Sequence, residues 1–586
     1  MDNKKQSLKE VFTEAQEYYK KKNFKKAEIY CYKILSIDPN HFNSLSLLSN
    51  LFAINRDFNK AKELLEKAIK IQPDNTTILN NLGTAYKELG DTEKAITFYK
   101  KILGINSNHT NANYNLGLIF YGLKELKKSK EYLERTVKIQ PNYAFAHFSL
   151  GNLQKEFKEL KKAKESFQKA IELRPNFASA QNNLGLIFSN SGDPGSAMKC
   201  YKKAIEIDPK HAGAYNNLGR LYTETGELEK AIASHKEAIK LEPQNLVHIY
   251  YLSELDKSFL NSEVKNKTEK ILNQKKTYRI NLAYGNFVLS RYERKEKNYH
   301  KEFNYLIKAH KNYFELKKEK FELGVRYCFN DVLQISKFSK LKNINSNNKI
   351  KPIFIVGVPR CGSTLIEKII SSGKESIPMG EEVVALEHCI NNKVLEKKSL
   401  DLGDAEKFGN ELVNIYKDKG LIHKKSNFVF TDKSLNNFFY LELIKNVFPE
   451  AKVINCRRET LSSIMSILQN NLTELAWAHN LDNIFKYFDN YFEITSMFKK
   501  KYPGYIYDLD FEEFTKEPEI ESKKLLKYCN LTWDAKCLEF YKRKDIISKT
   551  TSRIQIRKPI FKNTTEKYLP YKKFLDEYGK KYSWFN

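Results

Sequence analysis

The stretch "NNLGTAYKELGDTEKAITFYKKILGINSN" (residues 80–108) decides how the first half of the chain folds. Apolar residues recur on both sides of its Gly90-Asp91 turn at the three- and four-residue spacing of an amphipathic helix. Two helices joined by so short a turn pack against each other in antiparallel fashion. The stretch therefore predicts a helical hairpin as the structural unit of this half.

The hairpin recurs along the chain at a period of 34 residues. The recurring positions hold proline (Pro39, Pro73, Pro141, Pro175, Pro209 and Pro243), glycine (Gly83, Gly117, Gly151, Gly185 and Gly219) and alanine (Ala27, Ala61, Ala95, Ala163, Ala197 and Ala231). Ser107 and Ser129 fill the gaps in the proline and alanine series. Small residues let the paired helices approach closely, and proline ends each unit because it cannot continue a helix. Three series at one period predict a stacked array of repeats.

This pattern resembles the tetratricopeptide repeat, whose length and residue pattern match it. The resemblance covers residues 1–250, about seven units, and implies an all-α superhelix. Because such arrays present a concave surface, we expect a protein or peptide partner in the repeat groove. Residues 251–345 are expected to be helical, with at least one degenerate repeat, and to end in a linker rich in Asn and Lys.

A change of pattern after Pro352 predicts a second domain over residues 350–586. Short β-rich runs alternate there with helical patterns: "IFIVG" (353–357), "FVFT" (428–431), "KVINC" (452–456) and "YIYDL" (505–509). Alternation of this kind predicts an α/β domain with a central parallel sheet and crossover helices. Ligands bind at the carboxyl ends of such strands, so the residues that follow each run are candidates for a site.

The first run leads into a loop with the glycine spacing of a phosphate-binding loop. Gly357 and Gly362 match the pattern G-x-x-x-x-G-K-[ST], but Ser363 stands where that pattern has lysine. The glycines allow the backbone to wrap an anion, and the helix expected from Ser363 directs amide hydrogens at it. Arg360, earlier in the loop, adds a forked pair of donors. The loop therefore predicts a P-loop-like anion site with a displaced cation.

Two other strand ends carry polar residues that suit the same kind of ligand. Asp432 and Lys433 follow the second run, and Arg458 follows the third. Ser466 lies two helical turns beyond Arg458, so this pair can meet a second phosphate. Because the strand ends meet at one edge of the sheet, these side chains and the loop predict one anion site.

Three segments make the second half resemble the sulfotransferase family. "GVPRCGSTLIEKIISSG" (357–373) is similar to the family's 5′-phosphosulfate loop, and "TDKSLNNFFYLELIKNVFPEAKVINCRRETLSSIMSIL" (431–468) to the block that follows it. "TTSRIQIRKPIFKNTTEKY" (550–568) resembles a third block near the C-terminus. The three stand in the family's order. Tetratricopeptide repeats joined to such a domain are a known bacterial architecture, and the tyrosylprotein sulfotransferases share the C-terminal pattern.

No metal is expected, because the sequence shows no carboxylate cluster with suitable spacing. The resemblance implies a co-substrate, 3′-phosphoadenosine 5′-phosphosulfate (PAPS). Its 5′-phosphosulfate is expected on Arg360, Cys361, Gly362, Ser363 and Thr364, and its 3′-phosphate on Arg458 and Ser466. Ser552 and the loop after it (Arg553, Ile554, Gln555, Ile556, Arg557 and Lys558) are expected to close over the nucleotide, with Lys567 near the phosphosulfate.

The resemblance also implies the reaction, transfer of a sulfonate group to a hydroxyl of an acceptor. Glu381 or Glu382 falls on the catalytic base, and both remain open because the alignment slips by one residue there. Arg360 and Lys433 are expected to stabilise charge on the departing phosphate, as positioned cations do. The acceptor is left open among a peptide tyrosine, a glycan, a lipid and a small molecule.

Two other functions compete with this one. A P-loop kinase or NTPase would need lysine at position 363 and a magnesium-binding aspartate at a strand end, whereas Asp432 is followed at once by Lys433. A non-catalytic repeat adaptor with an inactive sulfotransferase-like domain is the second alternative.

Composition bounds the remaining questions. The formal charge of +29 favours anionic ligands, but Lys, Asn and Ile are abundant throughout, as codon usage in an AT-rich genome produces, so no nucleic acid is expected. The eight cysteines form no C-x-x-C pair, and no run of about 18 apolar residues occurs. We therefore expect a cytoplasmic protein without a membrane span.

Overall fold

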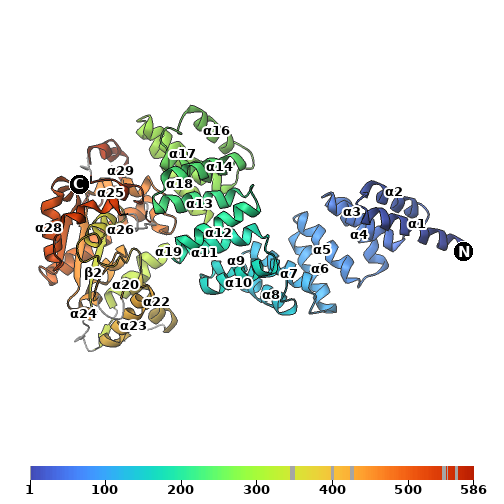
Figure 1. The fold of residues 1–586 in the computed structure, drawn as a ribbon, viewed down its shortest axis with the longest axis horizontal. Coiled ribbons are helices and arrows are strands. Elements are labelled where there is room, and N and C mark those ends of the chain that lie inside the picture. The colour runs from blue at the N-terminus through green and yellow to red at the C-terminus, as the bar shows by residue number, and fades with distance from the viewer. Residues whose placement is uncertain are drawn as a thin grey trace. The chain divides into compact units, whose positions relative to one another are not determined.

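The computed structural model describes residues 2–338, 340–342, 350–397, 401–422, 428–543, 550, 552–560 and 565–585. The chain divides into two compact units, Met1–Ala214 and Tyr215–Asn586, each of which is described by itself (Figure 1).

The first unit is an array of antiparallel helical hairpins, which confirms the predicted repeat fold. Its helices are α1 (Asp2–Lys20), α2 (Phe24–Leu35), α3 (Phe42–Ile54), α4 (Phe58–Ile71), α5 (Thr76–Glu88), α6 (Thr92–Ile105), α7 (Thr110–Gly122), α8 (Leu126–Ile139), α9 (Ala144–Glu156), α10 (Leu160–Leu173), α11 (Ala178–Asn190) and α12 (Pro194–Ile207). Each odd-numbered helix packs along the even-numbered helix that follows it.

The recurring glycines are needed because each faces a large side chain of its own hairpin. A Cβ atom on Gly151 would lie 2.8 Å from the ring of Phe167, and one on Gly185 would lie 2.6 Å from the ring of Tyr201. Both distances are shorter than a carbon–carbon contact allows. The serine that interrupts the alanine series is also explained, since the buried hydroxyl of Ser129 donates to the carbonyl of Gly117 at 2.8 Å.

The second unit begins with more helical hairpins. They are formed by α13 (Ala212–Thr225), α14 (Leu228–Leu241), α15 (Leu246–Leu255), α16 (Ser262–Leu272), α17 (Arg279–Lys295), α18 (Tyr299–Leu316), α19 (Lys318–Arg326) and α20 (Val332–Phe338), with a π-helical turn η1 (Tyr327–Asp331) before α20. The apolar faces of α17 and α18 point into the interior, where Phe287 of α17 and Leu306 of α18 are fully buried.

A four-stranded parallel sheet follows, as predicted. Its order is β4-β2-β5-β6, built from β2 (Lys351–Gly357), β4 (Val429–Asp432), β5 (Lys452–Arg457) and β6 (Ile506–Asp510). The four strands overlap the four predicted runs. A further parallel pair, β1 (Lys340–Lys342) with β3 (Asp401–Asp404), was not predicted because both strands are short and lack a β-branched run.

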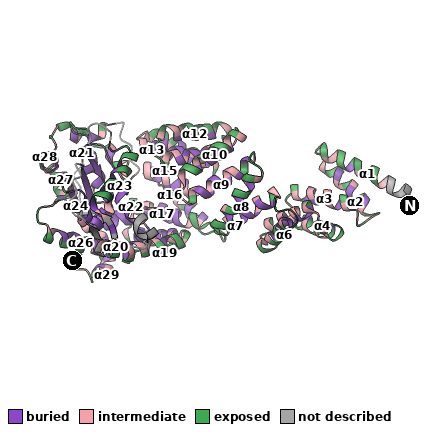
Figure 2. Ribbon diagram, turned by 90° about the horizontal axis from the view of Figure 1, so that it is seen from below, coloured by how far each residue is buried: buried purple, intermediate pink, exposed green. Residues whose placement is uncertain are grey.

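Among the strands, β2 is buried from Pro352 onward, whereas the edge strand β6 is mostly half-buried or exposed. Helices cover the sheet (Figure 2). They are α21 (Ser363–Ser371), α22 (Ala385–Lys397), α23 (Ala405–Asp418), α24 (Leu441–Val447), α25 (Thr460–Leu468), α26 (Leu481–Lys501), α27 (Phe511–Lys516), α28 (Pro518–Tyr528) and α29 (Lys572–Gly579), with 3₁₀ turns η2 (Leu435–Tyr440), η3 (Ala476–His479), η4 (Ala535–Lys542), η5 (Gln555–Arg557) and η6 (Thr565–Tyr571). One apolar core runs from Leu246 in α15 through the sheet to Leu575 in α29. The helices before the sheet and the sheet itself are therefore packed as one body.

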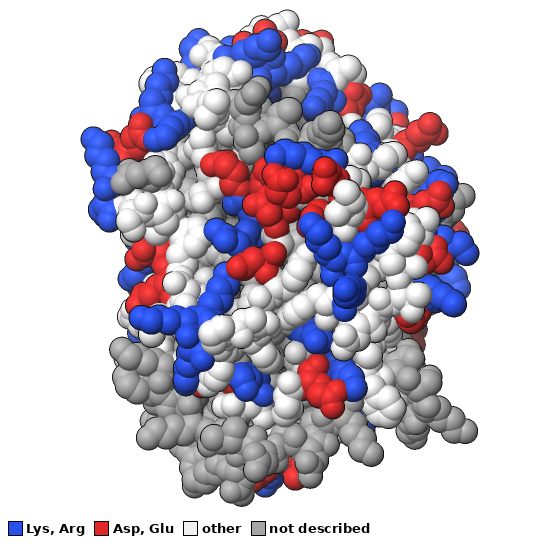
Figure 3. Space-filling view, turned by 90° about the vertical axis from the view of Figure 1, so that its left-hand side faces the viewer, with Lys and Arg blue, Asp and Glu red and all other residues white. Residues whose placement is uncertain are grey.

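The excess positive charge does not form a continuous basic field on the face drawn in Figure 3. Acidic side chains gather in a patch there, with Lys and Arg side chains around it. Within the described ranges, no helix is both long and apolar enough to span a bilayer.

Replacing Gly185 by alanine should destabilise the repeat array, because the new methyl group would press on the buried ring of Tyr201. We expect a loss of about 1–3 kcal/mol in the free energy of unfolding, the usual effect of overfilling a packed interior. Urea unfolding followed by far-ultraviolet circular dichroism measures it. Gly104→Ala is the control, since Gly104 lies in α6 with open space around it and should gain up to about 1 kcal/mol. Equal effects of the two substitutions would contradict the packing explanation.

Candidate active site

The candidate site lies where four parallel strands end at one edge of the sheet. Gly357 at the end of β2 is in register with Cys456 of β5, and Arg457 of β5 with Asp510 of β6. On the other side of β2, Phe354 is in register with Asp432 at the end of β4. The loop after β2, Lys433 after β4 and Arg458 after β5 therefore come to the same edge, as predicted for a parallel sheet.

Two glycines give the loop after β2 its shape. Gly357 has φ +147°, and a Cβ atom there would lie 2.6 Å from the carbonyl oxygen of Cys456. Gly362 has φ +95°, and a Cβ atom there would overlap the ring of Phe511. α21 starts at the next residue, Ser363, so its free amide groups face the space enclosed by the loop.

Arg360 joins this loop to two hydroxyl groups that are distant in sequence. Its Nε donates to Ser466 Oγ at 3.0 Å and its Nη1 to Ser552 Oγ at 2.8 Å. Its backbone is left-handed, with φ +73°, which is uncommon for a residue with a side chain. The guanidinium therefore points toward Ser466, which was predicted to hold the 3′-phosphate, and Ser552, which was predicted to close over the nucleotide.

A second arginine lies against the first. Nη1 of Arg458 donates to the carbonyl oxygen of Arg360 at 3.1 Å, and its guanidinium carbon lies 5.4 Å from the ring centre of Phe511 and 6.0 Å from that of Tyr568. Burial, with the nearby charge of Arg458 as a further cause, lowers the pKa of Arg360 to about 10. Two half-buried guanidinium groups this close favour an anion between or beside them, and the carboxylate of Glu512, 3.8 Å from Nε of Arg458, supplies part of that negative charge.

The two arginines border a cavity of about 100 Å³. Predicted residues on its wall are Arg360, Gly362, Arg458, Ser466, Ser552, Gln555, Ile556 and Lys558, and the remaining wall is mostly apolar, with Phe511, Phe540, Pro559, Ile560 and Tyr568. Its cations and flat apolar walls suit part of a nucleotide, because a cavity of this size is smaller than the sites that enclose a whole one.

Other predicted residues of the closing loop lie elsewhere. The side chains of Arg553 and Arg557 bind the helices before the sheet, at Glu254 and at the carbonyl of Glu224. Ile554 is half-buried and does not line the cavity. The side chain of Lys567 falls outside the described residues.

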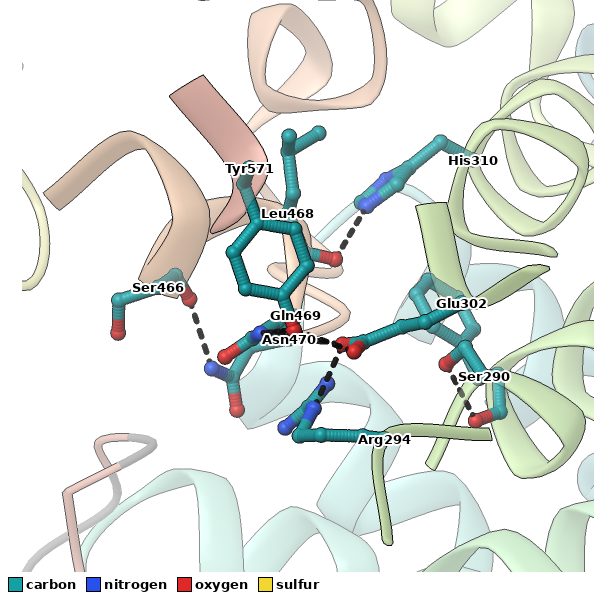
Figure 4. A network of polar contacts seen from close by, with 10 residues as sticks. Ser290, Arg294, Glu302, His310, Ser466, Leu468, Gln469, Asn470 and Tyr571 are labelled. Atoms are coloured by element: carbon teal, nitrogen blue, oxygen red, sulfur yellow. Dashed lines mark hydrogen bonds and ion pairs between the residues drawn. The ribbon is translucent and has the colours of Figure 1, made fainter. Parts of the chain in front are cut away.

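The helix that carries Ser466 is fixed from behind by α18. Gln469, just after α25, donates to the carboxylate of Glu302 at 3.0 Å, and His310 Nε2 donates to the carbonyl of Leu468 at 2.8 Å (Figure 4). Glu302 has no exposed surface and also accepts from the hydroxyl of Tyr571. These contacts decide where α25 places its serine.

A second group of ionisable residues lies on the β4 side of the loop. The Nζ of Lys433 is 3.6 Å from Oε1 of Glu381, and the two side chains are only 2% and 13% exposed. Glu382 is exposed, and its backbone has φ +53°. Although burial lowers it, the charges of Glu381, Glu367 and Glu382 raise the pKa of Lys433 above its usual value. The two candidate bases, Glu381 and Glu382, therefore both help to keep Lys433 positively charged.

Sequence reasoning missed two charged residues inside this group, Glu367 and Lys368 of α21. Both are buried, and Glu367 Oε1 accepts a hydrogen bond from the hydroxyl of Thr431 at 2.8 Å. Burial raises the pKa of Glu367 to about 7, against the opposing charge of Lys433. The sequence does contain a signal for them, a Glu-Lys pair inside the otherwise apolar run "LIEKII" (365–370). Charged residues in such a run are rarely buried unless they are paired, so the pair could have been noted as a candidate.

Cys361 of the loop is buried against another thiol. A hydrogen bond from the Cys456 thiol lowers the pKa of Cys361, and the amide of Ser363 at the start of α21 acts in the same direction. Ser363 and Thr364 are buried at the same helix start, and Thr364 Oγ1 lies 3.5 Å from Thr550 Oγ1. Over the described ranges, no three His, Cys, Asp or Glu side chains are grouped to hold a metal ion.

Comparison with known families agrees with this description. Residues 352–535 match the model of the sulfotransferase family, and tetratricopeptide-repeat models match within residues 12–233. The chain thus joins tetratricopeptide repeats to a domain of the sulfotransferase family, as the sequence resemblance predicted.

Individual relatives cover parts of the chain. An uncharacterised protein of Aquifex aeolicus (strain VF5) is 32% identical over 327 residues, which is 52% of this chain and 42% of that protein, so the match spans less than half of the relative's length. Among solved structures, YrrB, described as a TPR protein with an unusual peptide-binding site, is 25% identical over 32% of this chain and 97% of its own, with a TM-score of 0.28. A tetratricopeptide repeat protein of Parabacteroides merdae is 21% identical over 44% of this chain and all of its own, with a TM-score of 0.36.

The buried carboxyl group of Glu367 should make stability depend on pH. Its pKa is raised from 4.5 to about 7 on folding, so the folded chain keeps a proton that the unfolded chain releases, and stability falls as pH rises between these values. Glu367→Gln keeps an acceptor for Thr431 but cannot ionise. Its stability relative to the unaltered chain should therefore increase by up to about 3 kcal/mol as pH rises from 5 to 8.

Thermal unfolding over that pH range measures this difference. Glu450→Gln is the control, because Glu450 is an exposed carboxylate of the same domain that pairs across the surface with Lys351. A constant difference between Glu367→Gln and the unaltered chain would show that Glu367 titrates normally.

Proposed function

We propose that the chain is a PAPS-dependent sulfotransferase that moves a sulfonate group to a hydroxyl of an acceptor. The observation that carries the proposal is the half-buried pair Arg360 and Arg458 with the hydroxyls of Ser466 and Ser552, near the start of α21. This arrangement offers cations, hydroxyl donors and helix amides to a ligand with two separate anionic groups. The family match of residues 352–535 supports the same reaction class.

The geometry suggests how the two halves of the site divide the work. On the β5 side, Arg360 and Arg458 would bind the nucleotide's phosphates while Phe511 and Tyr568 offer flat surfaces. On the β4 side, Lys433 lies beside Glu381, next to the loop that would hold the phosphosulfate. The helix start at Ser363 lies between the two sides and completes the anion site.

The reaction would proceed as a direct transfer. The acceptor oxygen attacks sulfur, the bond between sulfur and the bridging phosphate oxygen breaks, and the acceptor proton passes to the carboxylate of Glu381 or Glu382. The products are a sulfate ester and 3′-phosphoadenosine 5′-phosphate. Lys433 and the loop amides would stabilise the negative charge that grows on the departing phosphate.

One contact argues against the kinase or NTPase alternative. Asp432, the aspartate at the end of β4, is fully buried and already accepts hydrogen bonds from the Tyr416 hydroxyl at 2.6 Å, the Ser434 amide at 3.0 Å and Asn437 at 3.1 Å. A carboxylate used in this way supports the turn after β4 and has little capacity left for magnesium. The repeats support recruitment of a protein or peptide, either as acceptor or as partner.

Arg458→Ala should weaken binding of 3′-phosphoadenosine 5′-phosphate about 10- to 100-fold, because charge-assisted hydrogen bonds contribute roughly 1.5–3 kcal/mol. Isothermal titration calorimetry measures the affinity. The matched control is Arg457→Ala, which removes the neighbouring exposed arginine and should change affinity little. The unaltered chain should be protected against heat by this nucleotide and not by ATP with Mg²⁺; the reverse preference would favour a kinase.

Substitution of the two candidate bases should separate them. One of Glu381→Gln and Glu382→Gln should lower kcat for transfer from labelled PAPS about 100- to 10,000-fold, the usual effect of losing a general base. Nucleotide affinity should be retained in both variants, which calorimetry checks. If both variants kept full kcat, the base would have to be sought elsewhere. If the unaltered chain transferred no label to any acceptor fraction, the adaptor alternative would stand.

A further inference from the structure

The segment 552–558, which forms one wall of the nucleotide cavity, is held by the helices before the sheet. Ser552, Gln555 and Lys558 face the cavity. Alternating with them, Arg553 and Arg557 face the other way and bind α15 and the turn between α13 and α14. The segment therefore lies between the cavity and the helical array.

The first anchor is an ion pair. Nη2 of Arg553 lies 3.1 Å from Oε2 of Glu254, near the end of α15, and the two side chains are only 11% and 18% exposed. A charge this far from water is stable only while its partner is present. Without Glu254, the Arg553 side chain would be more stable in water than in its present position. Its movement toward solvent would displace the segment to which it belongs.

The second anchor joins the side chain of Arg557 to two backbone carbonyl groups. Nη2 of Arg557 donates to the carbonyl of Glu224 at 3.1 Å, and its Nη1 donates to the carbonyl of Arg543, also at 3.1 Å. The turn that presents Glu224 contains Gly226, whose φ is +87°, and a Cβ atom there would lie 3.0 Å from Nε of Arg557. Glycine thus lets the guanidinium lie flat against the turn.

The anchored segment reaches the loop after β2 in one more step. Ser552, adjacent to Arg553, accepts the hydrogen bond from Nη1 of Arg360. Glu254 is therefore connected to Arg360 by two polar contacts, one at Arg553 and one at Ser552, with the backbone between these two neighbours as the link. Within the segment, the amide of Ile556 donates to the carbonyl of Ser552 at 3.1 Å, and the amide of Lys558 donates to that of Gln555 at 3.2 Å. The segment therefore has a defined conformation that the loss of an anchor can disrupt.

We propose that Glu254 and the turn at Glu224–Gly226 are positioning elements that hold residues 552–558 closed over the nucleotide, so that the end of the helical array sets nucleotide affinity. The inference rests on the proposed function for the identity of the nucleotide. It assigns Arg553 and Arg557 to anchoring the loop, in place of the direct nucleotide contact expected from the sequence. Because linkage is reciprocal, bound nucleotide must also strengthen the attachment of this segment to the array.

The test uses the full chain with Glu254→Gln, which keeps the size of the side chain and removes its charge. Calorimetry should show affinity for 3′-phosphoadenosine 5′-phosphate weakened about tenfold, as when the competent conformation falls to roughly a tenth of the population. In the transfer assay the KM for PAPS should rise while kcat changes little. The matched control is Glu237→Gln, which removes a carboxylate of α14 that pairs with Lys240 on the surface.

A double-mutant cycle separates positioning from general destabilisation. Arg553→Gln should weaken binding as Glu254→Gln does, and the double variant should be no worse than either single variant, because both remove one interaction. Additive losses would overturn the proposal. The cycle also protects the test against a fold defect in either single variant, since circular dichroism identifies a misfolded member.

Hydrogen exchange of peptides spanning 552–560 gives a readout that needs no nucleotide. Amide protection in this segment should fall in Glu254→Gln and stay unchanged in Glu237→Gln. If the unaltered chain binds the nucleotide but affinity and exchange are the same in Glu254→Gln, the inference is wrong and the proposed function stands. If the unaltered chain does not bind it, the proposed function fails, while the exchange result still decides whether Glu254 holds the segment.

Discussion

The carboxylate of Glu302 is the interaction on which the arrangement of the second unit depends most. It has no contact with solvent, and it accepts hydrogen bonds from Arg294 in α17, Gln469 after α25 and Tyr571 at the end of η6. A buried charge must be matched by donors or its burial becomes strongly unfavourable. Because these donors come from segments far apart in the chain, the matching requirement brings the helical array, α25 and the C-terminal region together at one point.

The polar residues at the edge of the sheet form two groups. Cations and hydroxyls gather on the β5 side around Arg360 and Arg458, whereas the ion pair of Lys433 and Glu381 lies on the β4 side. The loop between β2 and α21 separates them and belongs to both. Transfer of a sulfonate group would need this separation, because the attacking oxygen and the departing oxygen must lie on opposite sides of the sulfur atom.

Much of the fold could be predicted from sequence because its signals are local. The 34-residue period and the four β-rich runs are each readable within one segment, and helices and strands formed where they were expected. The direction of the Arg360 side chain and the roles of Arg553 and Arg557 could not be read in this way. They depend on contacts across 106 to 333 residues, and a guanidinium near a phosphate motif looks the same in sequence whichever way it points. The burial of Glu302 was equally invisible, since its donors are scattered over the chain.

The pairing of a glycine with a large residue inside each hairpin has a consequence for how such a protein can change over generations. Gly151 with Phe167 and Gly185 with Tyr201 are each contained in a single unit, so copying or deleting a whole unit leaves every remaining pair complete. Glu224, Glu254 and Glu302, which are among the residues that contact the sheet domain, all lie beyond those units. The number of units can therefore change in steps of one hairpin while the glycine–ring pair inside each remaining unit stays complete.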